Sequence, residues 1–515
     1  MKFAPSSAEE TNYDDTNFMV NNGSDSSDKL DDSRGSTDSE SRDSSIQGED
    51  SKDEVQEMTS RPSSCCSLVL SVVKNTFSAI LLGFCIVVVS AAFFQKQTSA
   101  TGEYGLHPVI AFCIFWVLLL WLALMEGGLN VMVGLQPVDK DLYSATHKQT
   151  YGCTRVAHKG NNIDRFIVGR QYLDLMVVFL TNFMVSAIDD ANVLSLPEAV
   201  SDVFLASGVA VILVTIVIGQ LVAQINSASC MLDFVNNYVM LFTTYAALTV
   251  EASGILHSVY LIQIVVSKIA GKSTTTGNED RPVVHKCFFW IRVVFSVSLL
   301  LGALVITFKA LFEGSTTMWE GVPAYASVLI LVVLILVVGM MEGLQIAFMS
   351  VIHMPEEEVE AHPVVKRNCE LVFQGQKLQA FLVGRQIFQT IIMFVIARIT
   401  TLDPETPDEN IFGANDGVQQ FFNTGILGAL ISTIVASLSW RVLASSFPLA
   451  FLSNPFGRPI IQLCLLVEST GICSIAWSLA TLHRKVAGLK EDSYYLDNTA
   501  KDTEVKEDNT DGEEV

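Results

Sequence analysis

The sequence predicts an all-α integral membrane protein with ten transmembrane helices, arranged as two inverted five-helix repeats. Three observations lead to this fold class: long apolar runs recur along the chain, a set of motifs occurs twice at a nearly constant offset, and each copy contains an odd number of runs. Half of the 515 residues are hydrophobic and only 17% are charged, an unusually apolar balance for a soluble protein.

The two ends of the chain carry most of its formal charge of −22. Residues 1–60 hold 16 acidic and 5 basic side chains in polar, low-complexity sequence, so residues 1–62 are predicted to be a disordered acidic tail. Residues 486–515 form a short acidic C-terminal tail without heptads, which does not favour assembly through a coiled coil. The part between the tails is nearly neutral.

Ten apolar runs are long enough to cross a hydrocarbon core of about 30 Å, which takes roughly 20 helical residues. Only helices or closed barrels satisfy their backbone groups in lipid, and runs of this length indicate helices. The runs are 67–94, 108–134, 167–188, 203–225, 234–266, 288–312, 323–352, 378–399, 421–446 and 448–482.

Three landmarks occur twice in the same order and at nearly the same offset in residue number. Glu-Gly recurs with an offset of 216, Val-Gly-Arg-Gln with an offset of 215, and Val-Glu-x-x-Gly-Ile with an offset of 217. This indicates a duplicated unit, with repeat 1 at 63–270 and repeat 2 at 283–485. Because each unit holds five runs, the second copy enters the membrane with the opposite orientation. Inverted repeats around a site at the midplane are typical of secondary transporters.

Ionisable and amide side chains stand inside the apolar runs at matching places. Charges at such depth are unfavourable unless paired or facing a wet cavity, so we expect the pairs Glu126–Arg170 and Glu342–Arg385. Ion pairs among amides form a neutral site rich in donors and acceptors. We expect one central, solvent-reachable cavity lined by Glu126, Asn130, Arg170, Gln171, Glu342, Gln345, Arg385 and Gln386. The alternative is that two buried salt bridges only clamp helices together.

Glycines accompany the charged residues of both motifs. Gly127 and Gly343 follow the glutamates, and Gly169 and Gly384 precede the arginines. Glycine is the residue that most readily lets a helix break or a backbone approach closely. We therefore expect a helix break or a close approach at these four positions.

Three further carboxylates are candidate ligands for a coupling ion. Glu251 and Glu468 match across the repeats, and either holding a cation or pairing with a cationic side chain would explain them. Asp174 lies one turn after Arg170, where repeat 2 has Gln389, so a cation site and a simple Arg–Asp pair both remain open. The stretch Cys230-Met-Leu-Asp between two runs has too few ligands for a metal, and we expect a turn with a solvated Asp233.

The duplicated Glu-Gly-x-Gln and Gly-Arg-Gln motifs, on ten helices with the Cys230–Asp233 stretch, resemble the silicic acid transporters of diatoms. The resemblance covers roughly residues 65–485. It implies sodium-coupled uptake of orthosilicic acid, the precursor of biosilica, by a symporter. The first copy of the motif departs from the family pattern, since Leu129 stands where glutamine is expected and Asn130 could supply the amide one position later.

Two other functions of a membrane protein would use the same residues. One is a passive channel or carrier for another small neutral hydroxylated solute, such as boric acid, and another is a silicic acid sensor that moves no solute. An aquaporin-like channel should show two Asn-Pro-Ala half-helices, whereas the single Asn-Pro of this chain is Asn454-Pro455.

The remaining expectations concern chemistry, partners and location. The chain has no His-Glu-x-x-His motif, nucleophile elbow or P-loop, so we predict no enzyme activity, no catalytic residue, no metal site and no bound cofactor. The expected partners are silicic acid, a sodium ion and the lipid bilayer, with no nucleic acid, and a homo-oligomer stays open. The expected location is the plasma membrane, as a multi-pass protein, with intracellular vesicle membranes as a second location.

Overall fold

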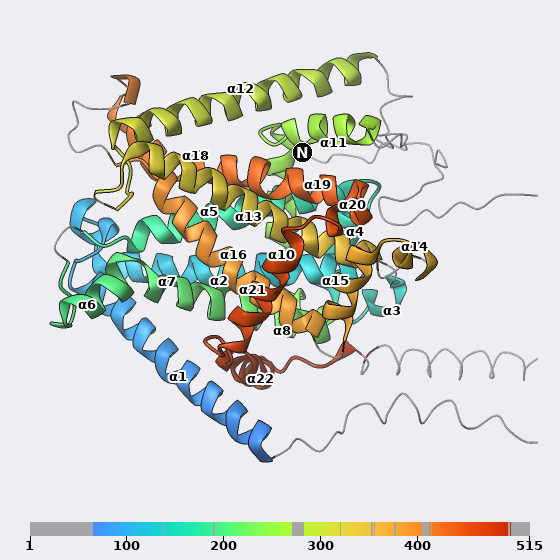
Figure 1. Ribbon diagram of the computed structural model, residues 1–515, viewed down its shortest axis with the longest axis horizontal. Coiled ribbons are helices and arrows are strands. Elements are labelled where there is room, and N and C mark those ends of the chain that lie inside the picture. The colour runs from blue at the N-terminus through green and yellow to red at the C-terminus, as the bar shows by residue number, and fades with distance from the viewer. Residues whose placement is uncertain are drawn as a thin grey trace, which may run out of the picture. The chain divides into compact units, whose positions relative to one another are not determined.

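The computed structural model describes residues 65–136, 138–188, 191–269, 283–319, 321–351, 354, 356–374, 377–403, 411–413, 415–492 and 495. Contacts divide the chain into a unit 1–73 and a unit 74–515, and the second unit is the subject below. Within the described residues the regular structure is entirely helical (Figure 1), which confirms the all-α part of the prediction. The predicted disordered tail 1–62 and most of the C-terminal tail lie outside the described residues.

The first half of the chain contains one set of helices and π-helical segments. They are α1 (Cys65–Phe94), η2 (Ser99–Glu103), α2 (Pro108–Gly134), α3 (Asp141–Ser144), α4 (Lys148–Ala157), α5 (Asn162–Val185), α6 (Glu198–Ser201), η3 (Asp202–Ala206), α7 (Val209–Val214), η4 (Thr215–Leu221), α8 (Val222–Ser229), α9 (Met231–Phe234), α10 (Tyr238–Ala252) and α11 (Ser258–Ile269).

The second half contains a closely similar series. It comprises α12 (Val283–Glu313), α13 (Ala324–Val351), α14 (Glu356–Glu360), α15 (Pro363–Phe373), α16 (Lys377–Thr400), a short 3₁₀ turn η6 (Ile411–Gly413), α17 (Asp416–Asn423), α18 (Ile426–Ile431), η7 (Ser432–Leu438), α19 (Ser439–Ser446), α20 (Pro448–Leu452), α21 (Gly457–Ser469) and α22 (Ile475–Ala487).

The correspondence between the halves extends to irregular details. The π-helical segments η4 and η7 have the same length and begin at Thr215 and Ser432, which are related by the same offset as the Val-Glu-x-x-Gly-Ile motifs. The helices just before them are preceded by left-handed glycines, Gly208 with φ 78° and Gly425 with φ 82°. Such π segments are rare and often lie at functional sites, so their repetition indicates that the duplicated unit preserved more than a hydrophobic pattern. The boundaries 63–270 and 283–485 remain predictions.

Seven described helices are long and apolar enough to cross a membrane. They are Val69–Phe94, Pro108–Gly134, Val209–Ser229, Val283–Glu313, Ala324–Val351, Lys377–Thr400 and Ile426–Ser446. Helix α5 is 24 residues long, as α16 is, but it contains Asp164, Arg165, Arg170 and Asp174 and is not among the seven. The multi-pass character of the chain follows from these spans.

Four of the ten predicted spans are interrupted, which corrects the expectation of ten continuous helices. The runs 203–225 and 421–446 are interrupted near their beginning, at Gly208 and Gly425. The run 234–266 divides into α10 and α11 around Gly254, whose φ is +90°, and the run 448–482 divides into α20, α21 and α22, with a second break at Gly471, whose φ is +74°. Local signals for these breaks are present at Gly254, Asn454-Pro455 and Gly471, but the length of an apolar run does not reveal them.

The first helix of each half closes the break in the other half. Ser78 of α1 donates its hydroxyl to the carbonyl of Ile472 and accepts the N–H of Ile475 at 3.2 Å. Reciprocally, Ser296 of α12 donates to Ile255 O at 2.6 Å and accepts the N–H of Ser258 at 3.0 Å. Backbone groups at a break in a membrane helix need such partners, because lipid offers none. The first helix of each half therefore packs against the other half.

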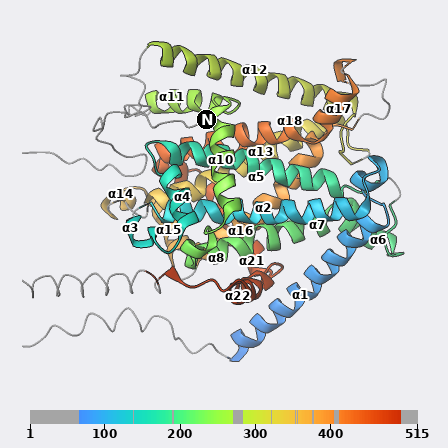
Figure 2. The ribbon, with the colours of Figure 1, turned by 180° about the vertical axis from the view of Figure 1, so that it is seen from behind.

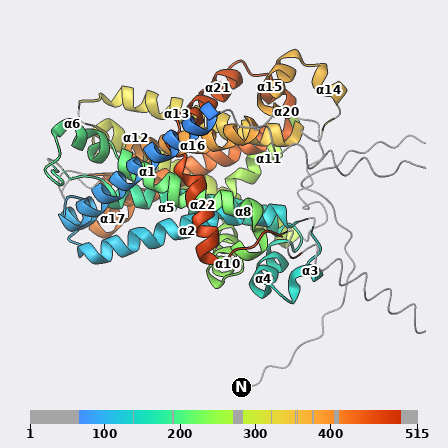
Figure 3. The same cartoon turned by 90° about the horizontal axis from the view of Figure 1, so that it is seen from below.

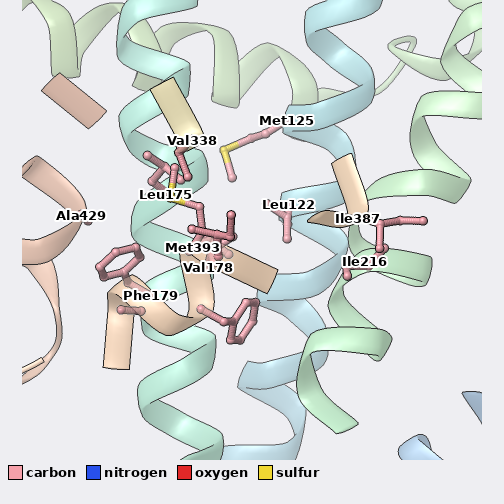
Figure 4. Packing of buried hydrophobic residues seen from close by; sticks show 14 of the residues in the cluster. Leu122, Met125, Leu175, Val178, Phe179, Ile216, Val338, Ile387, Met393 and Ala429 are labelled. Carbon is pink, nitrogen blue, oxygen red and sulfur yellow. The ribbon is translucent and has the colours of Figure 1, made fainter. Parts of the chain in front are cut away.

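Helices α5 and α16 contact each other and also pack against the π-containing helices of both halves, so they lie at the centre of this unit, as Figures 1 and 2 show. Around them is an apolar core with side chains from both halves (Figure 4), including Leu122, Val178, Val338 and Met393. Leu122 and Val338 are related by the offset of the Glu-Gly motifs, and Val178 and Met393 by that of the Val-Gly-Arg-Gln motifs, so equivalent residues meet at one core.

Candidate functional site

Helices α2 and α5 bring the first Glu-Gly and Gly-Arg-Gln motifs together. Arg170 Nη1 lies 3.7 Å from Glu126 Oε2 and 3.8 Å from Asp174 Oδ1. Arg170 also donates through Nη2 to Gln171 Oε1 at 2.8 Å and through Nη1 to the carbonyl of Met125 at 3.3 Å. Arg170 is only 1% exposed, so this guanidinium is held by groups of the protein rather than by solvent.

Helices α13 and α16 form the matching arrangement in the second half, with one added charge. Arg385 Nη1 lies 3.7 Å from Glu342 Oε2, the same separation as in the first half. Glu342 has a closer partner, however, because Arg441 of α19 approaches the same oxygen to 2.8 Å. Gln389 and Ser437 donate to Glu342 Oε1 at 2.7 and 3.1 Å. The Glu342 carboxylate is fully buried, and both its oxygens are occupied.

The two arrangements differ at positions related by the repeat. Asp174, Gln220 and Gln224 in the first half correspond to Gln389, Ser437 and Arg441 in the second, at offsets of 215, 217 and 217 in residue number. Gln224 Nε2 reaches Glu126 Oε2 at 3.4 Å, so it occupies the role that Arg441 has beside Glu342. The first half-site thus has two carboxylates and one guanidinium, whereas the second has one carboxylate and two guanidinium groups. Their excess charges are opposite.

Side chains from the two halves also bond to each other. Gln386 Nε2 of α16 lies 3.5 Å from Glu126 Oε1 of α2, and Thr390 donates to Gln220 Oε1 at 2.6 Å. We use the name polar cluster for the set that these contacts join, which is Glu126, Arg170, Gln171, Asp174, Gln220, Gln224, Glu342, Arg385, Gln386, Gln389, Thr390, Ser437 and Arg441. Met125, Leu175 and Ile387, which are sequence neighbours of Glu126, Asp174 and Gln386, belong to the apolar core (Figure 4).

The polar cluster retains donors that no described protein group satisfies. Both motif arginines have a buried Nε–H without a hydrogen-bond partner, at Arg170 and at Arg385. Gln171 accepts from Arg170 through its oxygen, while its amide nitrogen bonds to none of the described residues. A buried unsatisfied donor costs about 1–3 kcal/mol, so these groups are available for hydrogen bonds to a ligand. Arg398 and Arg484, outside the polar cluster, also have a buried Nε–H without a partner.

The remaining predicted site residues make no hydrogen bond to the polar cluster among the described residues. Gln345 is half-buried, and within the described part of the chain its amide has no hydrogen-bond partner. Asn130 is exposed and donates to Ser227 Oγ at 3.2 Å. Leu129 is half-buried at the position that corresponds to Gln345. Asn130 is thus already engaged, and it does not stand where Gln345 does.

The variant Leu129→Gln should therefore tighten substrate binding. It would place an amide where repeat 2 has Gln345, and one added hydrogen bond is worth about 0.5–1.5 kcal/mol, or roughly two- to tenfold in affinity. Asn130→Ala, which removes an amide that already bonds Ser227, should change affinity little. Saturation curves for uptake test both variants. Weaker uptake by Leu129→Gln together with a marked loss in Asn130→Ala would instead assign the amide role to Asn130.

The four motif glycines serve close helix packing and do not break helices, which corrects one of the two expectations for them. Helices α2, α5, α13 and α16 run through them without interruption. A Cβ on Gly127 would lie 2.4 Å from the Phe234 ring, and a Cβ on Gly343 would lie 2.2 Å from the Phe451 ring. At Gly169 and Gly384 it would lie 1.9 Å from a backbone carbonyl oxygen, of Ala247 and Cys464 respectively.

The other candidate carboxylates lie outside the polar cluster. Glu251 is buried and pairs with Arg165 Nε at 2.6 Å, and Tyr260 donates to it at 3.1 Å, which accounts for this carboxylate as an ion pair beside the α10–α11 break. Glu468 is half-buried and has no ion pair within the described residues. Asp233 is not solvated as expected, because its carboxylate lies 3.1 Å from His147 Nε2 and its side chain is 18% exposed. Asp174 is the one coupling-ion candidate in the polar cluster.

Sequence reasoning missed Arg441, Gln224, Gln220 and Ser437. A signal for Arg441 was present, because an arginine inside the apolar run 421–446 is unfavourable in lipid unless it has a partner. Applying the repeat offset to it leads to Gln224. Gln220 carried the same kind of signal, as an amide inside the apolar run 203–225. The hydroxyl of Ser437 carries none, because serine is common in helices.

Comparison with known proteins adds one positive finding. A family model described as "Silicon transporter" matches residues 67–514. No curated protein matches, and no solved structure matches.

Proposed function

This chain belongs to the silicon transporter family, and from that premise we propose that it carries orthosilicic acid through the membrane by alternating access, coupled to sodium. Membership of a transporter family means that the chain is not an enzyme and that silicic acid is its substrate. The polar cluster is the proposed substrate site, sodium the proposed coupling ion, and the plasma membrane or an intracellular vesicle membrane the proposed location.

The unsatisfied donors of the polar cluster carry the proposal for the substrate site. Orthosilicic acid is uncharged near neutral pH and has four hydroxyls, each of which donates and accepts hydrogen bonds. Such a solute matches the buried Nε–H groups of Arg170 and Arg385 together with the free amide of Gln171. Charges that cancel over the whole cluster suit a neutral solute better than an anion or a cation.

Alternating access is supported by the symmetry and burial of the cluster. The reciprocal contacts of Ser78 and Ser296 are those expected of two units related by a two-fold axis, as in inverted-repeat transporters with discontinuous helices. Gln171, Glu342 and Gln386 are at most 5% exposed. The centre of the cluster is therefore buried in this conformation, whereas Gln224 and Arg441 are half-buried at its margin. The predicted solvent-reachable cavity would belong to inward-open and outward-open states.

The first half-site is the proposed place for sodium, which prefers oxygen ligands. Asp174 is 4% exposed, and its Oδ1 has no hydrogen-bond partner among the described residues. It shares the single guanidinium of Arg170 with Glu126, so one positive charge is lacking there. In the second half-site Arg441 supplies the corresponding charge to Glu342. A transported cation would neutralise the excess negative charge of the first half-site, beside Glu126, where the second half-site has Arg441 beside Glu342.

Uptake of silicic acid into proteoliposomes, with and without an inward sodium gradient, tests the proposed function. Saturable accumulation that depends on the gradient supports a symporter. Flux without saturation or sodium dependence would indicate a channel, and silicic acid binding without flux would indicate a sensor. A preference for boric acid over silicic acid in competition would contradict the proposed substrate.

The variant Gln386→Leu should weaken substrate binding while leaving the fold intact. It removes the amide that joins Glu126 to the second half-site but leaves the Glu342–Arg385 pair in place. Losing a buried partner should cost about 1–3 kcal/mol, or roughly five- to 150-fold in apparent affinity. Gln462→Leu, on the exposed side of α21, is the matched control. Unchanged half-saturation in Gln386→Leu would mean that the cluster is a structural clamp.

A further inference from the structure

The chain after α22 turns back onto the first half of the protein. Gly488, with φ 68°, ends α22, and we use the name strap for the described residues that follow it, 488–492 and 495. Asp492 is 9% exposed, and its two carboxylate oxygens accept the N–H groups of Met231 at 2.8 Å and Leu232 at 2.9 Å. The first part of the predicted acidic tail is thus packed against the corner between α8 and α9.

Asp233 in that corner holds the strap at two more points. The backbone N–H of Lys490 donates to Asp233 Oδ2 at 2.7 Å, and the hydroxyl of Tyr495 lies 3.1 Å from the same oxygen. His147 lies on the other side, with its Nε2 3.1 Å from Asp233 Oδ1 and its ring at 4.5 Å from the Tyr495 ring. Asp492 on the strap therefore accepts hydrogen bonds from the corner, and Asp233 in the corner accepts hydrogen bonds from the strap.

Helix α22 is attached to the same corner just before the strap begins. Arg484 donates to Ser229 Oγ at 2.9 Å, and Asn226 lies 2.8 Å from His483 Nδ1. Figure 3 shows α22 beside α8, and the two helices are in contact. A continuous set of polar contacts therefore connects the end of the second half to α8 and α9 of the first.

The equivalent corner of the second half, between α19 and α20, lacks the groups that hold the strap. Met231, whose N–H bonds Asp492, corresponds through the repeat offset to Pro448, which has no N–H. Asp233 corresponds to Ala450, which has no polar side chain. The N–H group and the carboxylate that hold the strap are therefore present in the first half and absent from the matching positions of the second half.

The corner also packs against the helix that carries Glu126. Phe234 follows Asp233 directly, and its ring occupies the space beside Gly127, where a Cβ would lie 2.4 Å away. Gly127 is the neighbour of Glu126 on α2. Movement of the corner would therefore shift a ring that packs against α2 next to Glu126.

We propose that the strap is a latch, which binds the α8–α9 corner through Asp492 and Asp233 and slows transport while it is bound. This inference rests on the proposed function, because alternating access requires the two halves to move relative to each other. The latch connects the last helix of one half to the corner of the other. While the latch is bound, its hydrogen bonds must break before the two halves can move relative to each other. Release of the latch removes that requirement.

Hydrogen exchange on the full-length protein in nanodiscs tests the docking, and uptake into proteoliposomes tests its effect. In Asp492→Ala the amides of Met231 and Leu232 should exchange about tenfold faster, while amides within α10 should not change. The maximal uptake rate should rise about two- to tenfold at unchanged half-saturation. Tyr495→Phe, which removes only one hydroxyl, should shift both quantities in the same direction by a smaller amount. Lys485→Ala, an exposed residue of α22, is the control.

The outcomes separate this inference from the proposed function. Unchanged exchange at Met231 and Leu232 in both variants would show that the strap does not bind the corner and would overturn the latch. Faster exchange with an unchanged or lower maximal rate would also overturn it. If the unmodified protein accumulates no silicic acid, the proposed function fails, whereas the exchange measurement still decides whether the strap is docked.

Discussion

Replacing Gly384 by alanine should prevent this protein from reaching its folded state, and Gly169→Ala should do the same. The added methyl would lie 1.9 Å from the carbonyl oxygen of Cys464 in one case and of Ala247 in the other. Each of these oxygens belongs to a helix backbone, so it cannot rotate away as a side chain could. Helix α16 would have to separate from α21, or α5 from α10, along the whole contact.

The expected loss exceeds the usual cost of an overpacked core, about 1–3 kcal/mol, because backbone rather than side chain is displaced. Gly83→Ala and Gly302→Ala are matched controls, since both glycines lie within helices and have no atom within 4 Å of an added Cβ. These controls should be neutral or stabilising by up to about 1 kcal/mol, from helix propensity. The yield of monodisperse protein in detergent and its Tm measure the effect. A monodisperse Gly384→Ala protein with a Tm close to that of the parent would contradict the observed helix packing.

The variant Asp174→Asn should abolish the dependence of uptake on sodium. It removes the second carboxylate of the first half-site and leaves Glu126 balanced by Arg170 alone, so no positive charge is lacking. Accumulation driven by a sodium gradient should disappear, while net flux of silicic acid down its own concentration gradient should continue. Asp164→Asn, on the same helix but outside the polar cluster, should retain sodium dependence.

Gln224→Arg tests the same idea by adding a charge instead of removing one. It gives the first half-site the residue that the second has in Arg441, which lies 2.8 Å from Glu342. A tethered guanidinium should take the place of the transported cation, so this variant should also lose sodium dependence. If both Asp174→Asn and Gln224→Arg accumulate silicic acid only with a sodium gradient, the sodium site lies elsewhere and the half-site charges have another role.

Much of the architecture was accessible from local properties of the sequence. Apolar run length predicted the helical membrane class, and the run 108–134 coincides with α2. The constant offsets predicted that equivalent residues would recur, and the Glu126–Arg170 and Glu342–Arg385 pairs lie at the same 3.7 Å separation. These inferences succeeded because a charged side chain inside an apolar run needs a partner of opposite charge. In each repeat the arginine of the next motif, in the following apolar run, supplies such a partner.

The sequence by itself determined the class of protein, the duplication and the residues of the two motif pairs. Only the tertiary structure decided that Arg441 is the closest partner of Glu342, that Ser78 and Ser296 close breaks in the opposite halves, and that Asp492 lies on the α8–α9 corner. The physical reason is common to all of them. Apolar patterning and motif spacing record how deeply a segment is buried, but a hydrogen bond or ion pair depends on which segments, far apart in the chain, come within about 3 Å of each other.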